Sequence, residues 1–130
     1  MRHAVIVCAL FLSGHALADD GLTADQVGMV SACLERKSGE DCVGKAADAC
    51  AEANTLNAPN AWQARTWCAW AEAALWAKAA RIDAATLPRK ECPHDADNDT
   101  MDDPFPMLAR DAEVADCAMR EAAHAALGTR

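Results

Sequence analysis

The sequence has no apolar run long enough to cross a membrane. Its longest apolar run is Ala4 to Leu12, near the N-terminus, and this is about half of the roughly 20 residues that a spanning helix needs. The sequence also has no long stretch of alternating apolar and polar residues, which is the pattern of a β-strand. We therefore expect neither a membrane span nor a β-sheet in the mature protein.

Patterns typical of metal sites and of catalytic sites are also missing. There is no C-x-x-C pair and no cysteine–histidine spacing of the kind that binds zinc. No serine stands in a nucleophile motif, and beyond residue 18 the histidines are His94 and His124. Nothing in the sequence brings two of the glutamates Glu72, Glu113 and Glu121 into one cleft. We predict that the protein is not an enzyme and needs neither a metal nor a cofactor.

Basic residues are scarce relative to acidic ones. The chain has 12 Lys and Arg residues against 20 Asp and Glu residues, so its formal net charge is −8. An acidic surface disfavours binding to nucleic acid and to anionic membranes, and it favours basic partners. We expect the partner to be a basic protein, and the sequence leaves the oligomeric state open.

The N-terminus has the pattern of a secretory signal peptide. Arg2 and His3 form a basic start, the short apolar run follows, and the small residues Ala16 and Ala18 flank Leu17. This order is typical of a signal that a peptidase removes. We predict cleavage after Ala18, which leaves residues 19–130 as a single periplasmic or secreted domain. Because only Arg2 among the charged residues is lost, the net charge changes from −8 to −9.

Six cysteines remain after this cleavage: Cys33, Cys42, Cys50, Cys68, Cys92 and Cys117. An even number of cysteines in a short exported chain indicates a disulfide framework. Among the pairings that six cysteines allow, we predict Cys33–Cys42, Cys50–Cys68 and Cys92–Cys117. The middle pair would join two antiparallel helices, and the outer pairs keep the closed loops short. Three disulfides of about 2–4 kcal/mol each would offset a core built largely of alanine.

Helical patterns dominate the mature chain, and the predicted fold class is all-α, a small four-helix domain cross-linked by three disulfides. Thr23 and Gln26 form a capping box, with Leu22 and Val27 as a hydrophobic staple, and Asn60 is a second N-cap with Gln63 at the reciprocating position. The four helices are expected from Thr23 to about Gly39, from about Asp41 to Asn54, from Asn60 to about Ala85, and from about Pro106 to Leu127.

The third predicted helix carries all four tryptophans. Its apolar stripe consists of Ala61, Ala64, Cys68, Ala71, Leu75, Ala79 and Ile82. At about 100° per residue, Trp62 and Trp76 fall well away from this stripe, and Glu72 lies next to Trp76 in angle. Since large aromatic side chains anchor many protein interfaces, we predict that Trp62, Glu72 and Trp76 belong to a binding surface.

An acidic loop follows the third predicted helix. Asp95, Asp97 and Asp99 alternate as the ligands of a calcium loop do, but the sixth position is Thr100 instead of Gly and the twelfth is Pro106 instead of Glu. We therefore treat the three aspartates as candidate contacts for a basic partner. Weak calcium binding by the loop stays an alternative.

The segment Asp41–Cys50, followed by Trp67–Glu72 and Trp76, resembles the LprI-like lysozyme-inhibitor proteins of bacteria. In their pattern, two cysteines with a C-x-G-x-A-A stretch precede a third cysteine, a glutamate four residues later and then a tryptophan. The residues Cys42, Cys50, Cys68, Glu72 and Trp76 match this pattern in order and spacing. The similarity extends from about Cys33 to Arg81, and it departs after the tryptophan, where the family has Asp and then Leu-Asn.

This resemblance implies an exported, disulfide-linked helical domain that inhibits a lysozyme, and it carries over no inhibitory residue. Many lysozymes are basic, so an acidic chain would gain electrostatic steering toward one. The alternative is a structural or envelope-stress accessory protein that has no lysozyme target.

Overall fold

Four α-helices form the fold, and no strand occurs in the residues that the structure describes. The structure is a computed structural model that describes residues 21–36, 39–54, 60–90, 92 and 106–128. The helices are α1 (Ala24–Arg36), α2 (Lys45–Asn54), α3 (Ala61–Ala80) and α4 (Pro106–Leu127), with short 3₁₀ turns η2 (Glu40–Cys42) and η3 (Ala84–Thr86). The predicted all-α class with four helices is confirmed, whereas the predicted signal peptide lies outside the described residues.

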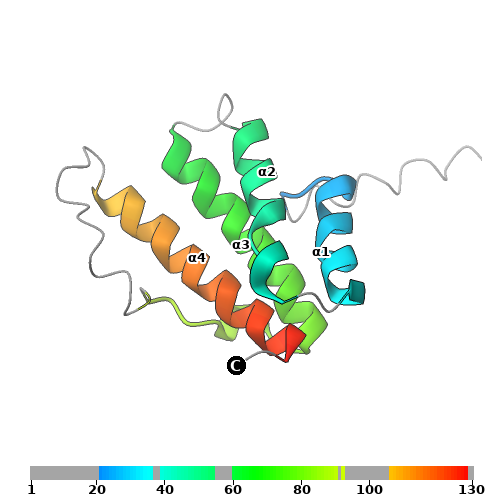
Figure 1. Cartoon of the computed structure of the whole chain (residues 1–130). Coiled ribbons are helices and arrows are strands. Elements are labelled where there is room, and N and C mark those ends of the chain that lie inside the picture. The colour runs from blue at the N-terminus through cyan, green and yellow to red at the C-terminus, as the bar shows by residue number, and fades with distance from the viewer. Residues whose placement is uncertain (1–20, 37–38, 55–59, 91, 93–105, 129–130) are drawn as a thin grey trace, which may run out of the picture.

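The central helix is α3, and the other helices pack around it (Figure 1). The helix α2 runs antiparallel to α3, whereas α4 runs parallel to α3 along most of its length. Because α3 and α4 point the same way, the chain has to return between them. The returning segment is held by Leu87, which is buried, and by Arg89, whose guanidinium lies 4.5 Å from the ring centre of Trp70.

Most of the buried residues are alanines. The buried alanines that belong to α3 and α4 are Ala64, Ala69, Ala71, Ala73, Ala77, Ala109, Ala112, Ala115, Ala118, Ala122 and Ala123. Such small side chains let the two helices approach closely, but each contributes little apolar area. Larger buried side chains are few, with Trp76 the largest. The hydrophobic core alone is therefore thin.

Three disulfides reinforce this thin core, in the pairing that we predicted. Cys33 of α1 is bonded to Cys42 at a Cα–Cα distance of 5.9 Å. Cys50 of α2 is bonded to Cys68 of α3, with a Cα–Cα distance of 5.7 Å, and this bond joins the antiparallel pair of helices as expected. The third bond links Cys92 on the returning segment to Cys117 on α4, with a Cα–Cα distance of 5.6 Å. Disulfides of this kind persist in oxidising compartments, and none of the described helices has the length and apolarity of a membrane span.

Both predicted N-terminal caps are present. The Gln26 amide donates to the Thr23 hydroxyl at 3.3 Å, and the Thr23 amide donates back to the Gln26 side chain at 2.9 Å, which completes the capping box. The Gln63 amide donates to Asn60 Oδ1 at 2.9 Å. Here the reciprocal bond is missing, because Gln63 Oε1 is buried and has no hydrogen-bond partner.

Two predicted helix boundaries are wrong by a turn. The second helix begins at Lys45 and not near Asp41, because Gly44 has a φ of +89° and interrupts the helix after η2. The third ends at Ala80 and not near Ala85. There Arg81 takes the left-handed conformation, its amide donates to Lys78 O, and the Ile82 amide donates to Ala77 O at 2.8 Å. These two bonds form a Schellman motif, which ends the helix.

The left-handed Arg81 yields a stability prediction. Side chains with a Cβ are strained in this conformation and glycine is not, so Arg81→Gly should raise the free energy of unfolding by about 0.5–1 kcal/mol. The control is Ala79→Gly, on an exposed helical position of the same turn, which should lower it by about 1 kcal/mol. Urea unfolding followed by circular dichroism measures both. A loss of stability in Arg81→Gly as large as that in the control would contradict the prediction.

Candidate functional site

A carboxylate lies in the centre of the fold. The Glu72 side chain on α3 is 0% exposed and accepts three hydrogen bonds. Its Oε1 accepts from the Gly44 amide at 2.8 Å and from Trp76 Nε1 at 2.9 Å, and its Oε2 accepts from the Ala47 amide at 2.7 Å. Burial of a carboxylate is costly unless hydrogen bonds compensate, and here three do.

The position of this carboxylate explains how α2 docks on α3. The first N–H groups of a helix have no partner within the helix, and this end carries partial positive charge. Glu72 supplies from another helix the cap that α2 lacks in its own sequence. The backbone requires glycine at position 44, because its φ is +89°, a conformation that side chains with a Cβ rarely adopt.

Burial removes two of the predicted interface residues from the surface. Trp76, like Glu72, is 0% exposed, so the expectation that both belong to a binding surface is wrong. The reason is that α2 and α4 both pack against α3 and the start of α2 covers Glu72, which the apolar stripe alone did not indicate. Trp62 is partly buried, and the tryptophan that reaches solvent is Trp67, at 53%. Asp95, Asp97 and Asp99 lie outside the described residues.

The residues that carry the family resemblance form one connected unit. Cys68, Glu72 and Trp76 are spaced four residues apart, so they share one face of α3. Through that face Cys68 is bonded to Cys50, and Glu72 holds the start of α2. The matching residues therefore hold the helices together, and their spacing of four residues was the pattern in the sequence that indicated a shared helix face.

Comparison with family models, curated proteins and solved structures finds no match for this chain.

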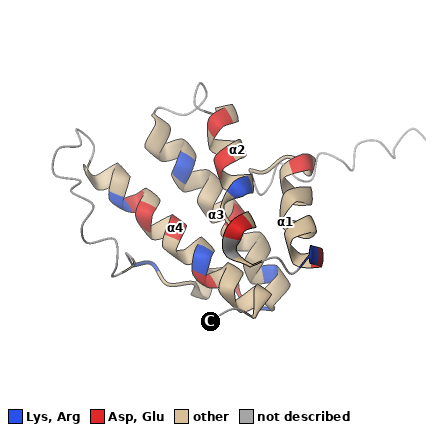
Figure 2. Cartoon of the chain, viewed as in Figure 1, with Lys and Arg blue, Asp and Glu red and all other residues tan. Residues whose placement is uncertain are grey.

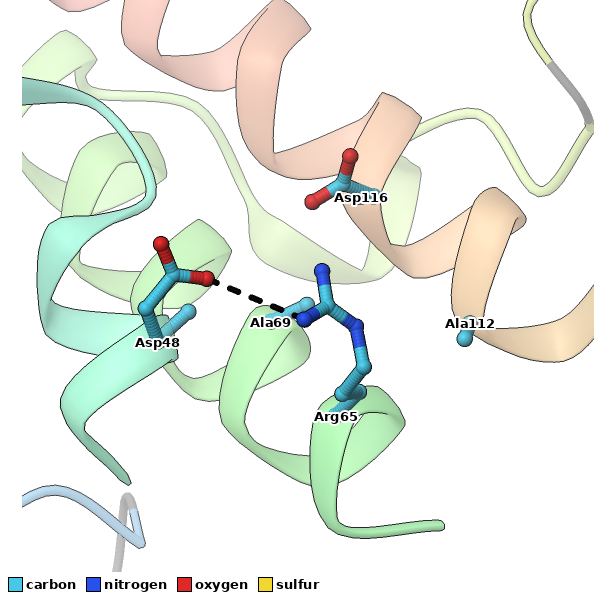
Figure 3. Close-up of a pocket in the computed structure, with 6 residues that line it drawn as sticks. Asp48, Arg65, Ala69, Ala112 and Asp116 are labelled. Carbon is cyan, nitrogen blue, oxygen red and sulfur yellow. Dashed lines mark ion pairs between the residues drawn. The ribbon is translucent and has the colours of Figure 1, made fainter. Parts of the chain in front are cut away.

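Charged side chains from three helices meet in a narrow cleft above Ala69. Figure 3 shows the Arg65 guanidinium of α3 between the carboxylates of Asp48 on α2 and Asp116 on α4. Arg65 Nη1 lies 3.9 Å from Asp48 Oδ1, and Asp116 forms an ion pair with Arg120 one turn further along α4. The free space is about 10 Å³, which is room for about one water molecule.

The cleft continues into a wider depression on the outside of α2 and α3, which we call the α2–α3 hollow. It is lined by Asp48, Ala51, Glu52, Ala61 and Arg65, and it has a volume of about 370 Å³. The small side chains of its two alanines leave this volume open. Its charged groups reach solvent, since the side chains of Asp48 and Arg65 are 64% and 50% exposed. Figure 2 shows acidic positions along α2 and both acidic and basic positions along α4.

The chemistry of these groups is that of ion pairing. Within the described ranges, no three His, Cys, Asp or Glu side chains come together to hold a metal ion. Asp48 and Glu52 line the α2–α3 hollow together with Arg65. Carboxylates accept charge-assisted hydrogen bonds from cationic side chains such as that of Arg65. The sequence did not single out Asp48, Glu52 or Arg65, because their proximity depends on how α2 docks on α3.

Proposed function

We propose that this protein is an exported, non-catalytic binding protein that inhibits a lysozyme. The observation that carries the proposal is the connected unit of Cys50, Cys68, Glu72 and Trp76, because these are the residues on which the resemblance to LprI-like inhibitors rests. A scaffold built in this way keeps the helices in place while leaving the outer surface available for binding.

Charge and compartment support the same proposal. The chain has an acidic excess, with a formal net charge of −8, and many lysozymes are basic, so association would be steered electrostatically. The three disulfides suit an oxidising environment, where a lysozyme that attacks the cell wall would be met. We accordingly place the protein in the periplasm or outside the cell.

Purified mature protein is expected to inhibit at least one basic lysozyme at micromolar concentration in a cell-wall lysis assay. Because screening weakens attraction between surface charges, the inhibition should weaken about tenfold between roughly 0.05 M and 0.5 M salt. A basic protein that is not a lysozyme serves as a control for attraction by charge alone. Lack of inhibition across a panel of lysozyme types would refute the proposal and favour an accessory protein with no lysozyme target.

A further inference from the structure

An exposed tryptophan and a stacked arginine share one side of the fold. Trp67 is 53% exposed, and it lies three residues before Trp70 on α3, so the two side chains are neighbours on the helix surface. The guanidinium of Arg89, from the segment that follows α3, lies 4.5 Å from the ring centre of Trp70. We call these three residues the Trp67 surface. It combines a flat apolar ring that reaches solvent with a nearby positive charge.

The segment that carries Arg89 is fixed on both sides of this residue. Leu87, two residues before it, is buried, and Cys92, three residues after it, is bonded to Cys117 on α4. Stacking on Trp70 uses the flat side of the guanidinium, whereas the N–H groups of a guanidinium point outward in its plane. The arginine is therefore held in place with donors that a partner can reach, and it loses little conformational entropy when that partner binds.

The positive charge of Arg89 has no carboxylate partner among the described residues. Arg89 is exposed, and the ion pairs that connect described residues join other side chains. The one acidic residue of α3 is Glu72, which is buried and bonded to the start of α2. An acidic chain thus presents, beside an exposed indole, a guanidinium that is available to an anionic group. Exposed tryptophan and arginine are the residue types that most often anchor protein interfaces.

We propose that the Trp67 surface enters the substrate cleft of the lysozyme and blocks it. This inference rests on the proposed function, and it names the surface of this chain and the part of the enzyme that meet. A glycoside hydrolase cleft holds sugar rings between two carboxyl groups and stabilises an oxocarbenium-like transition state that is positively charged. The Trp67 indole takes the place of a sugar ring. The Arg89 guanidinium pairs with a carboxylate of the cleft through two parallel hydrogen bonds.

Charge complementarity on two scales selects this occupant over others. The chain as a whole is acidic, with a formal net charge of −8, so a basic partner is attracted and a second copy of this chain is repelled. The Trp67 surface itself needs an anionic group next to a slot for a flat ring. An uncharged sugar would leave Arg89 unpaired, and an acidic protein would be repelled at long range. A basic enzyme whose cleft contains carboxylates meets both requirements.

Competition with a sugar tests where the contact lies. Inhibition is expected to be competitive, so that the KM for a soluble chitooligosaccharide rises while kcat is unchanged. In a calorimetric titration, tri-N-acetylchitotriose at about ten times its own dissociation constant should weaken binding of the protein to the lysozyme about tenfold. Inhibition that lowers kcat alone, or binding that the sugar does not weaken, would overturn the proposal.

Substitutions test the two side chains separately. Trp67→Ala should raise the inhibition constant about 30-fold, as the loss of an interface anchor does. Arg89→Gln should raise it about tenfold, and Arg89→Lys should not restore it, since lysine lacks the planar group that pairs through two bonds. The matched controls are Met107→Ala on α4, at a position that is 78% exposed, and Lys45→Gln on α2, an exposed cation. Each control should change the inhibition constant less than about twofold.

These outcomes separate the site from the proposed function. If the wild-type protein inhibits a lysozyme, but Trp67→Ala and Arg89→Gln inhibit as strongly as the two controls, the site is wrong and the function stands. If the wild-type protein neither binds nor inhibits any lysozyme, the function and the site both fail. Circular dichroism of each variant verifies that the fold is intact. The competition experiment uses the wild-type protein, so it decides the location of the contact even if a variant does not fold.

Discussion

Reduction of the three disulfides is expected to unfold the mature protein at 25 °C. Closed loops of 9, 18 and 25 residues together restrict the unfolded chain by about 9 kcal/mol in the loop-entropy estimate. Folded domains have total stabilities of only about 5–15 kcal/mol, and this core consists mainly of methyl groups. The loss should appear as a collapse of the helical circular dichroism signal when the protein is treated with a thiol reductant.

Pairwise alanine variants distinguish the contributions of the three bonds. Cys50→Ala with Cys68→Ala should lower the free energy of unfolding by about 3 kcal/mol, and the double variant at Cys33 and Cys42 somewhat less because its loop is shorter. Each should still unfold cooperatively, since two bonds remain. Retention of the native signal and of the same denaturation midpoint in the fully reduced protein would contradict this account of the stability.

Replacement of Glu72 by glutamine is expected to lower the free energy of unfolding by about 2–4 kcal/mol. Glutamine keeps the shape of glutamate, but its NH₂ group replaces one of the two acceptor oxygens. This NH₂ group then faces either the Ala47 N–H or both the Gly44 N–H and Trp76 Nε1–H. At least one buried donor is left without an acceptor, and the charge that complements the start of α2 is lost. Urea unfolding measures the change, and hydrogen exchange at Gly44 and Ala47 should accelerate.

The control for this substitution is Glu121→Gln, which changes an exposed glutamate on α4 and should alter stability by less than about 0.5 kcal/mol. A Glu72→Gln protein as stable as this control would show that the buried hydrogen bonds are not needed.

Local sequence patterns determined the four helices, two of their N-caps and the disulfide pairing. Hydrogen bonds within a few residues govern the helices and their caps: the capping box of Thr23 and Gln26 needs nothing beyond its own turn. The pairing of cysteines was predicted from the preference for short closed loops, which here span 9, 18 and 25 residues. The end of α3 and the start of α2 were not predicted correctly from the sequence. A left-handed arginine, Arg81, ends α3, and a glycine with positive φ, Gly44, precedes α2.

Only the tertiary structure decided which side chains of α3 reach the surface. The periodicity of a helix identifies one apolar face, but α3 packs against both α2 and α4, so it buries Trp76 and Glu72 outside the predicted stripe. The same packing brings Asp48, Arg65 and Asp116 together from three helices. Contacts between residues so far apart in the chain depend on how the helices pack, and no local pattern encodes the parallel packing of α4 on α3.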